Sequence, residues 1–212
     1  MGIIKKVKKF LKSEDKWFIV SDYVQMYLQQ LKKNKYSNFG KRSVVEKPIR
    51  LIGAKRIEIG DDVSILKNSR IEIVSMYHGV EYKGFLRIGS RTSIGQNFHC
   101  TSGGKLEIGE DVTISGNVLI TNIAHEYQKL GVHILEQELL FDETKIGDGC
   151  FIGFGAVIQP GVILGKQCVV GSNAVVMAGN YPDFCVVVGC PAKIVKQYDF
   201  NSKEWKRIEN QV

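Results

Sequence analysis

Apolar residues recur at every sixth position from residue 146 to residue 181. This run divides into six units, IGDGCF, IGFGAV, IQPGVI, LGKQCV, VGSNAV and VMAGNY, each of which opens on an aliphatic residue. Glycine follows that residue in four of the six units, and the fifth position is mostly small and apolar. A period this short gives each unit room for one brief strand and one turn. The pattern therefore predicts an all-β solenoid of stacked coils.

The same period runs less regularly through the residues before this run, and its interruptions are informative. Hexads are clear from Ile59, stop over residues 77–87, resume at Ile88, and stop again over residues 121–145. Insertions in a solenoid leave the scaffold as loops on one face, and loops on a rigid scaffold commonly carry sites. We therefore predict a β-helix domain over residues 44–197, with a site built from its two insertions.

Both ends of the chain lack the hexad period and read as helical. Residues 1–12 alternate apolar residues and lysines at helical spacing, which predicts a basic amphipathic helix, and a second helical stretch covers about residues 16–33. We expect the segment 1–43 to cap the open end of the solenoid. The basic helix either packs on the protein or contacts an anionic membrane surface, and the sequence leaves both open. Residues 198–212 predict a short C-terminal helix.

The net charge of +7 is a property of the N-terminal segment alone. Residues 1–35 hold nine lysines and three acids, which gives +6, whereas residues 36–212 hold 20 basic and 19 acidic side chains, which gives +1. A body this close to neutral is not that of a nucleic-acid-binding protein. We expect no nucleic-acid partner.

Cysteine usage and hydropathy bear on the compartment. The five cysteines form no CxxC pair, there is no signal peptide, and no apolar run approaches the ~18 residues of a membrane span. We therefore expect a cytoplasmic protein, at the inner face of the membrane if residues 1–12 bind lipid. Cys150 and Cys168 occupy the small fifth position of a hexad, and we expect both in the core.

Three segments together resemble the hexapeptide-repeat acyltransferases. They are the hexads, ITNIAHEY (residues 120–127) at the second break, and VVVGCPAKIVKQY (residues 186–198), which is similar to the closing GxPAK segment of that family. The resemblance covers residues 44–198. It implies a left-handed parallel β-helix, a homotrimer with active sites in clefts between subunits, and a CoA thioester, usually acetyl-CoA, as co-substrate.

Two further segments are similar to one subgroup of the family. FLRIG (residues 85–89) and IGQNFHC (residues 94–100) resemble enzymes that O-acetylate polysaccharide precursors, to which the galactoside and maltose acetyltransferases are related. This implies transfer of an acetyl group to a hydroxyl of a small-molecule or lipid-linked saccharide.

The acceptor side of the predicted site centres on His125. A sugar hydroxyl needs a base near neutral pH, histidine suits this role, and His125 matches the catalytic histidine of the family. By the same resemblance, His99 either contacts the acceptor or is a structural polar side chain. Thr101 stands at the position of an acceptor-binding asparagine. Asn122 either orients the acceptor or shapes the turn. Phe151 stands where many relatives carry a tryptophan beside the acyl group.

The residues expected to contact CoA are assigned by matching positions in the family's motifs. Phe154 matches the residue whose N–H polarises the thioester carbonyl, and Ser172, Met177 and Ala178 match further CoA-lining positions. Relatives often carry Thr-Lys at the latter two positions, so a common phosphate-binding lysine is missing. Lys193 or Lys196 is the candidate replacement, because the CoA phosphates need a cationic partner. The family requires no metal.

Several other functions compete with a saccharide O-acetyltransferase. A γ-type carbonic anhydrase shares the fold but needs three zinc-binding histidines, two of them five residues apart, and this sequence has no such pair. An amino-sugar N-acyltransferase or another small-molecule acetyltransferase, for example one acting on serine, remains an alternative. A non-catalytic trimeric sugar-binding scaffold is the third.

Overall fold

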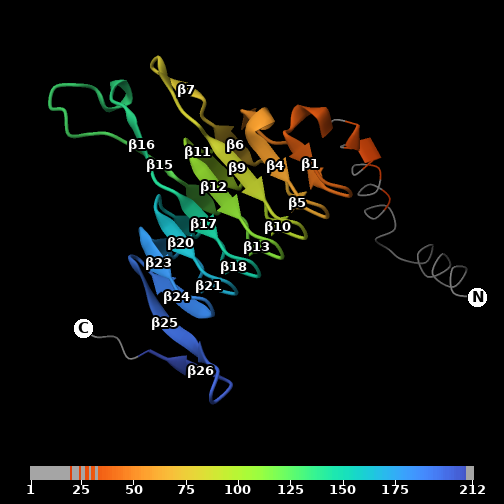
Figure 1. Cartoon of the computed structure of the whole chain (residues 1–212), viewed down its shortest axis with the longest axis vertical. Helices are drawn as coiled ribbons and strands as arrows, with labels where there is room; N and C mark the ends of the chain where they lie inside the picture. The colour runs from red at the N-terminus through yellow and green to blue at the C-terminus, as the bar shows by residue number, and fades with distance from the viewer. Residues whose placement is uncertain (1–19, 21–23, 25–26, 29, 32, 209–212) are drawn as a thin grey trace, which may run out of the picture.

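The computed structural model describes residues 20, 24, 27, 28, 30, 31 and 33–208. Its main body is a parallel β-helix with three faces, sheets A, B and C, each built from one strand per coil (Figure 1). Sheet A contains β1 (Asn38–Phe39), β4 (Ile57–Ile59), β9 (Phe85–Ile88), β12 (Lys105–Ile108), β17 (Thr144–Ile146), β20 (Val162–Leu164) and β23 (Gly179–Tyr181). Sheet B contains β2 (Val44–Val45), β5 (Ser64–Ile65), β10 (Ser93–Ile94), β13 (Thr113–Ile114), β18 (Phe151–Ile152), β21 (Val169–Val170), β24 (Cys185–Gly189), β25 (Ala192–Asp199) and β26 (Glu204–Arg207). Sheet C contains β3 (Arg50–Ile52), β6 (Arg70–Ile73), β11 (His99–Ser102), β14 (Leu119–Thr121), β19 (Val157–Ile158) and β22 (Val175–Val176).

Short elements lie outside these sheets. Two antiparallel hairpins pair β7 (Met76–Tyr77) with β8 (Val80–Glu81), and β15 (Ile123–His125) with β16 (Leu139–Phe141). Three 3₁₀ turns are η1 (Lys33–Lys35), η2 (Ala54–Arg56) and η3 (Ile134–Glu136). No helix among the described residues is both long and apolar enough to cross a bilayer.

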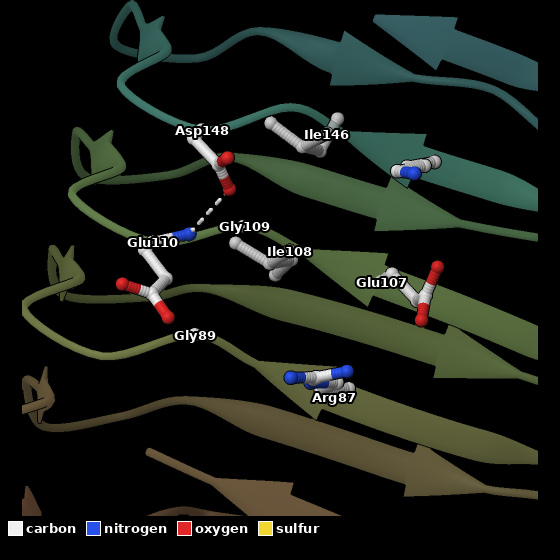
Figure 2. Close-up of a pocket in the computed structure, with 9 residues that line it drawn as sticks. Arg87, Gly89, Glu107, Ile108, Gly109, Glu110, Ile146 and Asp148 are labelled. Atoms are coloured by element: carbon white, nitrogen blue, oxygen red, sulfur yellow. Dashed lines mark hydrogen bonds between the residues drawn. The ribbon is translucent and has the colours of Figure 1, made fainter. Parts of the chain in front are cut away.

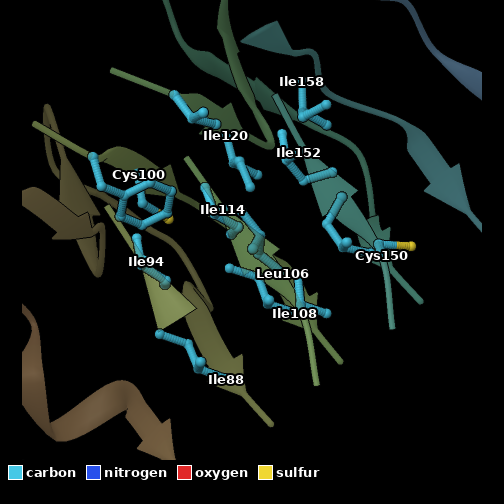
Figure 3. Close-up of a cluster of buried hydrophobic side chains, with 14 of the residues drawn as sticks. Ile88, Ile94, Cys100, Leu106, Ile108, Ile114, Ile120, Cys150, Ile152 and Ile158 are labelled. Carbon is cyan, nitrogen blue, oxygen red and sulfur yellow. The ribbon is translucent and has the colours of Figure 1, made fainter. Parts of the chain in front are cut away.

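The hexad period produces the core directly. The aliphatic residue that opens each unit points inward and stacks on its counterpart in the next coil, as Ile94, Ile114 and Ile152 do in sheet B (Figure 3). Val170 continues this stack after Ile152. Cys150 and Cys168 are buried and free, as predicted. The all-β solenoid predicted from the period and the parallel β-helix implied by the resemblance are confirmed.

Asparagine residues of the hexads lie at the corners between sheets, where the backbone needs a positive φ angle. Asn68, Asn97 and Asn117 all have positive φ angles of 58–65°, a conformation that asparagine tolerates better than most residues. Glycine is required where coils approach closely, since a Cβ on Gly89 would lie 2.5 Å from the backbone carbon of Gly109 in the next coil.

All departures from the period leave at one corner, between sheets C and A. The β7–β8 hairpin follows β6 and the β15–β16 hairpin follows β14, and both project from the same side of the β-helix (Figure 1). The predicted insertion at 77–87 was too long, because Phe85–Arg87 belongs to β9, where Leu86 is buried against Leu106 in the next coil. Likewise Thr144 and Lys145 belong to β17.

The predicted helix over residues 198–212 is wrong in the part that the structure describes. The chain turns back after β24, and β25 and β26 extend sheet B as antiparallel strands. Tyr198 lies opposite Trp205, their ring centroids 5.6 Å apart, and Phe200 contacts Tyr198. The open edge of β24 offers backbone hydrogen bonds along its length, and cross-strand aromatic pairs add to them, so pairing overrides the local helical pattern.

The N-terminal predictions fall largely outside the described residues. This holds for the amphipathic helix over 1–12 and for most of 16–33, where the described residues 20, 24, 27, 28 and 30 are helical. The β-helix itself starts earlier than residue 44, because β1 already pairs in parallel with β4.

Candidate functional site

A cavity of about 610 Å³ lies over the outer face of sheet C, beside the two hairpins. Strand β11 contributes His99 and Thr101 to its lining, strand β14 contributes Thr121, and the hairpins contribute Tyr77 and His125. Thr101 and Thr121 share a hydroxyl–hydroxyl hydrogen bond of 2.7 Å. Three residues predicted for the acceptor side are thus brought together in one cavity.

His125 is held in place by its hairpin and by an aromatic neighbour. It pairs with Leu139 across the antiparallel β15–β16 ladder, and its ring lies edge-on to Tyr77, with centroids 5.8 Å apart. Its Nδ1 atom is buried and has no hydrogen-bond partner among the described residues. Within the described chain, packing fixes the imidazole, and no carboxylate orients it.

Glu126, the nearest carboxylate in sequence, has another role. Its Oε1 atom accepts hydrogen bonds from the N–H groups of Tyr127 and Gln128, at 2.8 and 2.9 Å. The bond from Gln128, followed by that from Tyr127, holds the pKa of Glu126 below its usual range. This carboxylate therefore caps the turn after β15.

The two hairpins are joined by hydrogen bonds, although residues 82–122 separate them in the sequence. The Tyr77 hydroxyl donates a hydrogen bond to the carbonyl of Leu135. In the other direction, the N–H of Leu139 donates to the hydroxyl of the buried Tyr82, at 3.0 Å. The shorter hairpin therefore supports the loop that carries His125.

His99 lies in the ladder of sheet C, directly between Arg70 and Leu119. Burial, and secondly the positive charge of Arg70, lower its pKa, while Glu72 opposes the shift. His99 is therefore neutral near pH 7 and can accept or donate a hydrogen bond without carrying charge.

Asn122 is fully buried and does not line the cavity. Its Oδ1 accepts a hydrogen bond from the N–H of Gly103 at 3.0 Å, and its Nδ2 donates to the carbonyl of Lys105 at 3.1 Å. The two bonds connect the start of the large insertion to the Gly103–Gly104 link after β11 and to the first residue of β12. The contacts favour the turn-shaping alternative for Asn122 over contact with an acceptor.

Three predicted cofactor residues follow the corner between sheets B and C. The N–H of Asn173, next to Ser172, donates to the carbonyl of Phe154 in the preceding coil at 2.8 Å. One coil further, Lys193 lies opposite Val188 at the same corner. The Phe154 N–H donates to no described residue and its side chain is exposed. A free N–H of this kind fits the carbonyl of a thioester.

The remaining predicted residues lie on other parts of the β-helix. Phe151 projects from sheet B, whereas Met177 and Ala178 follow β22 at the corner between sheets C and A. None of the predicted acyl and cofactor residues lines the cavity around His125. Within one described chain, the acceptor residues and the cofactor residues are on separate surfaces.

Some cavity residues were missed by the sequence interpretation. Arg70 and Glu72 alternate with buried residues in β6, so their outward direction could be read from the hexads, but their place beside His99 could not. His78 and Tyr77 lie in the period-free insertion. His78 forms the hairpin tip with Gly79, both at positive φ, as a two-residue β-turn requires.

A second groove, over sheet A, is a weaker candidate (Figure 2). Its charged side chains include Arg87, Glu107 and Glu110, and Asp148 accepts a hydrogen bond from the N–H of Glu110 at 3.0 Å. No histidine and no predicted site residue lies in it. Over residues 33–208 and the six described positions before them, no three side chains are grouped as metal ligands.

Comparisons with known proteins agree with the repeat and with the fold. Residues 143–178 match the family model described as bacterial transferase hexapeptide (six repeats). A probable acetyltransferase of Mycobacterium tuberculosis is 31% identical over 115 residues, covering 54% of this chain and 38% of that protein. The galactoside O-acetyltransferase of Escherichia coli is 28% identical over 138 residues, covering 59% and 64%. The chain therefore spans less than two thirds of the length of either relative.

Among solved structures, AntD, an N-acyltransferase from Bacillus cereus in complex with dTDP and 3-hydroxybutyryl-CoA, superposes with a TM-score of 0.67. The match covers 82% of this chain and 90% of AntD at 19% sequence identity, which supports a common fold. Residues 143–178 thus carry a bacterial transferase hexapeptide repeat, and 54–59% of the chain is similar in sequence to the two acetyltransferases.

Proposed function

We propose that this protein transfers an acetyl group from acetyl-CoA to a hydroxyl of a saccharide, with His125 as general base. The observation that carries the proposal is the cavity beside the two hairpins, which gathers His125, His99 and Thr101. The similarity to acetyltransferases, one of them named for a galactoside, supports this reaction class.

The chain's own residues can be assigned to the steps of such a transfer. His125 accepts the proton of the acceptor hydroxyl as its oxygen bonds to the thioester carbonyl carbon. The N–H of Phe154 donates to the carbonyl oxygen as it becomes negative. The C–S bond then breaks, the acetyl ester remains on the acceptor, and the imidazolium returns its proton to the thiolate of CoA. Both substrates are bound together, and no acyl-enzyme forms.

The active form that we propose is a homotrimer of left-handed β-helices. The acceptor cavity and the proposed cofactor residues lie on separate surfaces of one chain, and a neighbouring copy would bring them together. Sheet B offers a suitable contact face, because its six parallel strands β2, β5, β10, β13, β18 and β21 contain no Asp, Glu, Lys or Arg. Sheet A, by contrast, carries the outward-facing Glu58, Arg87 and Glu107. Interface cores are depleted of charge in this way.

The reaction is tested by measuring release of free CoA with a thiol reagent. The acceptor panel contains free sugars, nucleotide sugars, amino sugars and serine. His125→Ala should lower turnover by about 10²–10⁴-fold. Glu126→Gln is the matched control, since its side chain keeps an acceptor for the turn, and its turnover should stay near that of wild type. Near-normal turnover of His125→Ala would refute the assignment, and preference for an amine would favour N-acylation. No binding of acetyl-CoA at millimolar concentration would favour a scaffold.

The assembly is tested by light scattering coupled to size exclusion. Wild type should have about three times the chain mass of 23.8 kDa. Thr113→Arg places a charge on the exposed outer face of sheet B and should dissociate the assembly, whereas Ile163→Arg on sheet A should not. A monomeric wild type, or equal effects of the two variants, would refute the proposed interface.

A further inference from the structure

Arg70 lines one end of the cavity over sheet C, and a second arginine, Arg50, lies beside it just outside the lining. Arg50 in β3 and Arg70 in β6 are direct neighbours in the parallel ladder, where like charges repel. Glu72 bridges the two arginines. Its Oε1 atom accepts a hydrogen bond from Nε of Arg70 at 2.9 Å and also forms an ion pair with Nε of Arg50. The Glu72 side chain is only 15% exposed, whereas those of Arg50 and Arg70 are 57% and 44% exposed.

The bridge leaves this end of the cavity positively charged. Two guanidinium groups against one carboxylate leave a single positive charge, and Glu72 is the one acidic residue in the cavity lining. The three histidines of the lining add no negative charge. The terminal Nη groups of Arg50 and Arg70 make no hydrogen bond to the described residues, so they remain available as donors.

The position of these donors relative to His99 determines which part of an acceptor they can bind. Arg70 lies one strand from His99, and Arg50 lies two strands away. Neighbouring strands are about 4.8 Å apart, so the donors lie roughly 5–10 Å from His99 along the sheet. An acceptor whose sugar contacts His99 and Thr101 would place a substituent there.

We propose that Arg50 and Arg70 bind a phosphate group on the acceptor, so that the substrate is a phosphorylated saccharide, with Glu72 as the residue that positions the two guanidinium groups. This inference rests on the proposed function, because it takes the cavity to be the acceptor site of an acetyl transfer. Guanidinium groups bind oxyanions through paired, charge-assisted hydrogen bonds. Two of them on adjacent strands match the four non-bridging oxygens of a diphosphate better than the two oxygens of a carboxylate.

The binding step is tested without catalysis, by calorimetric titration of the full chain with pyrophosphate. Wild type and Arg87→Gln, which removes an exposed arginine on sheet A outside the cavity, should bind alike. Arg70→Gln should bind about 10- to 100-fold more weakly, as expected for losing a hydrogen bond to a charged group, and Arg50→Gln should weaken binding in the same direction. Equal binding by Arg70→Gln and Arg87→Gln would overturn the proposal. So would loss of binding in Lys193→Ala alone, because pyrophosphate would then occupy the proposed cofactor site.

The second arm uses CoA release with matched acceptors. A nucleotide-diphosphate sugar and a short-chain polyprenyl-diphosphate sugar are compared with the methyl glycoside and the uronic acid of the same sugar. A phosphorylated acceptor should have the lowest KM, and Arg70→Gln should raise that KM at least tenfold more than it raises the KM for the methyl glycoside. Preference for the nucleotide-diphosphate sugar would indicate a soluble acceptor, and preference for the polyprenyl-diphosphate sugar would indicate a lipid-linked one. Preference for the uronic acid or the methyl glycoside would overturn the phosphate assignment. No CoA release with any acceptor would instead refute the proposed function, and the titration would still report on the arginines.

Discussion

Replacing Asn122 by alanine separates its two candidate roles. The side chain is fully buried, and the substitution removes the acceptor of the Gly103 N–H and the donor to the Lys105 carbonyl. An unsatisfied buried N–H costs about 1–3 kcal/mol, and the lost bond to the carbonyl costs about 1 kcal/mol. The sum is about 2–4 kcal/mol of unfolding free energy. For a chain of this length, about 3 kcal/mol corresponds to a Tm lower by roughly 6–12 °C.

The assay is thermal unfolding followed by circular dichroism at one fixed protein concentration, since the Tm of an assembly depends on concentration. The control is Asn180→Ala, an exposed residue of β23 with no side-chain hydrogen bond to the described residues, which should change stability by less than about 0.5 kcal/mol. Below the transition, Asn122→Ala should lower kcat, because His125 follows three residues later, and leave the acceptor KM nearly unchanged. An unchanged Tm together with an acceptor KM raised more than tenfold would refute the structural role.

Three further predictions concern the hairpins, the cavity and the cofactor. Tyr77→Phe removes the bond to the second hairpin, worth about 0.5–1.5 kcal/mol, and should lower kcat about 2- to 12-fold with little change in Tm; an unchanged kcat would show that the contact does not position His125. Because the folded pKa of His99 lies below the unfolded value of about 6.5, its protonation destabilises the fold, so stability from this residue is lost as pH falls below about 6.5. His99→Gln should flatten that slope in pH-dependent Tm measurements, and a midpoint above 6.5 in an NMR titration of His99 would contradict the sign. Lys193→Ala should raise the KM for acetyl-CoA but not that for desphospho-acetyl-CoA, and equal effects on both would remove the proposed phosphate contact.

The sequence determined the β-helix because each hexad specifies one strand and one turn, and three hexads complete a coil. An aliphatic residue at the start of each hexad must face inward, and a small residue at its fifth position must fit the corner, so the burial of Ile152 and Cys168 could be predicted without coordinates. The same period located His125, since a residue outside the repeat is free to project from the scaffold. Hexad position fixes the direction of a side chain relative to the core, which is a local property.

The tertiary structure decided which distant residues meet. Arg70 and His99 are neighbours only through the ladder of sheet C, whose register depends on how many residues the β7–β8 hairpin takes up between the coils. The contact of Tyr77 with His125 likewise exists because both insertions leave at the same corner. At the C-terminus, the open edge of β24 offered more hydrogen bonds than a short isolated helix could make, and β25 and β26 are strands for that reason. A local period cannot encode such pairings, because each depends on backbone groups and side chains that come together only when the coils stack.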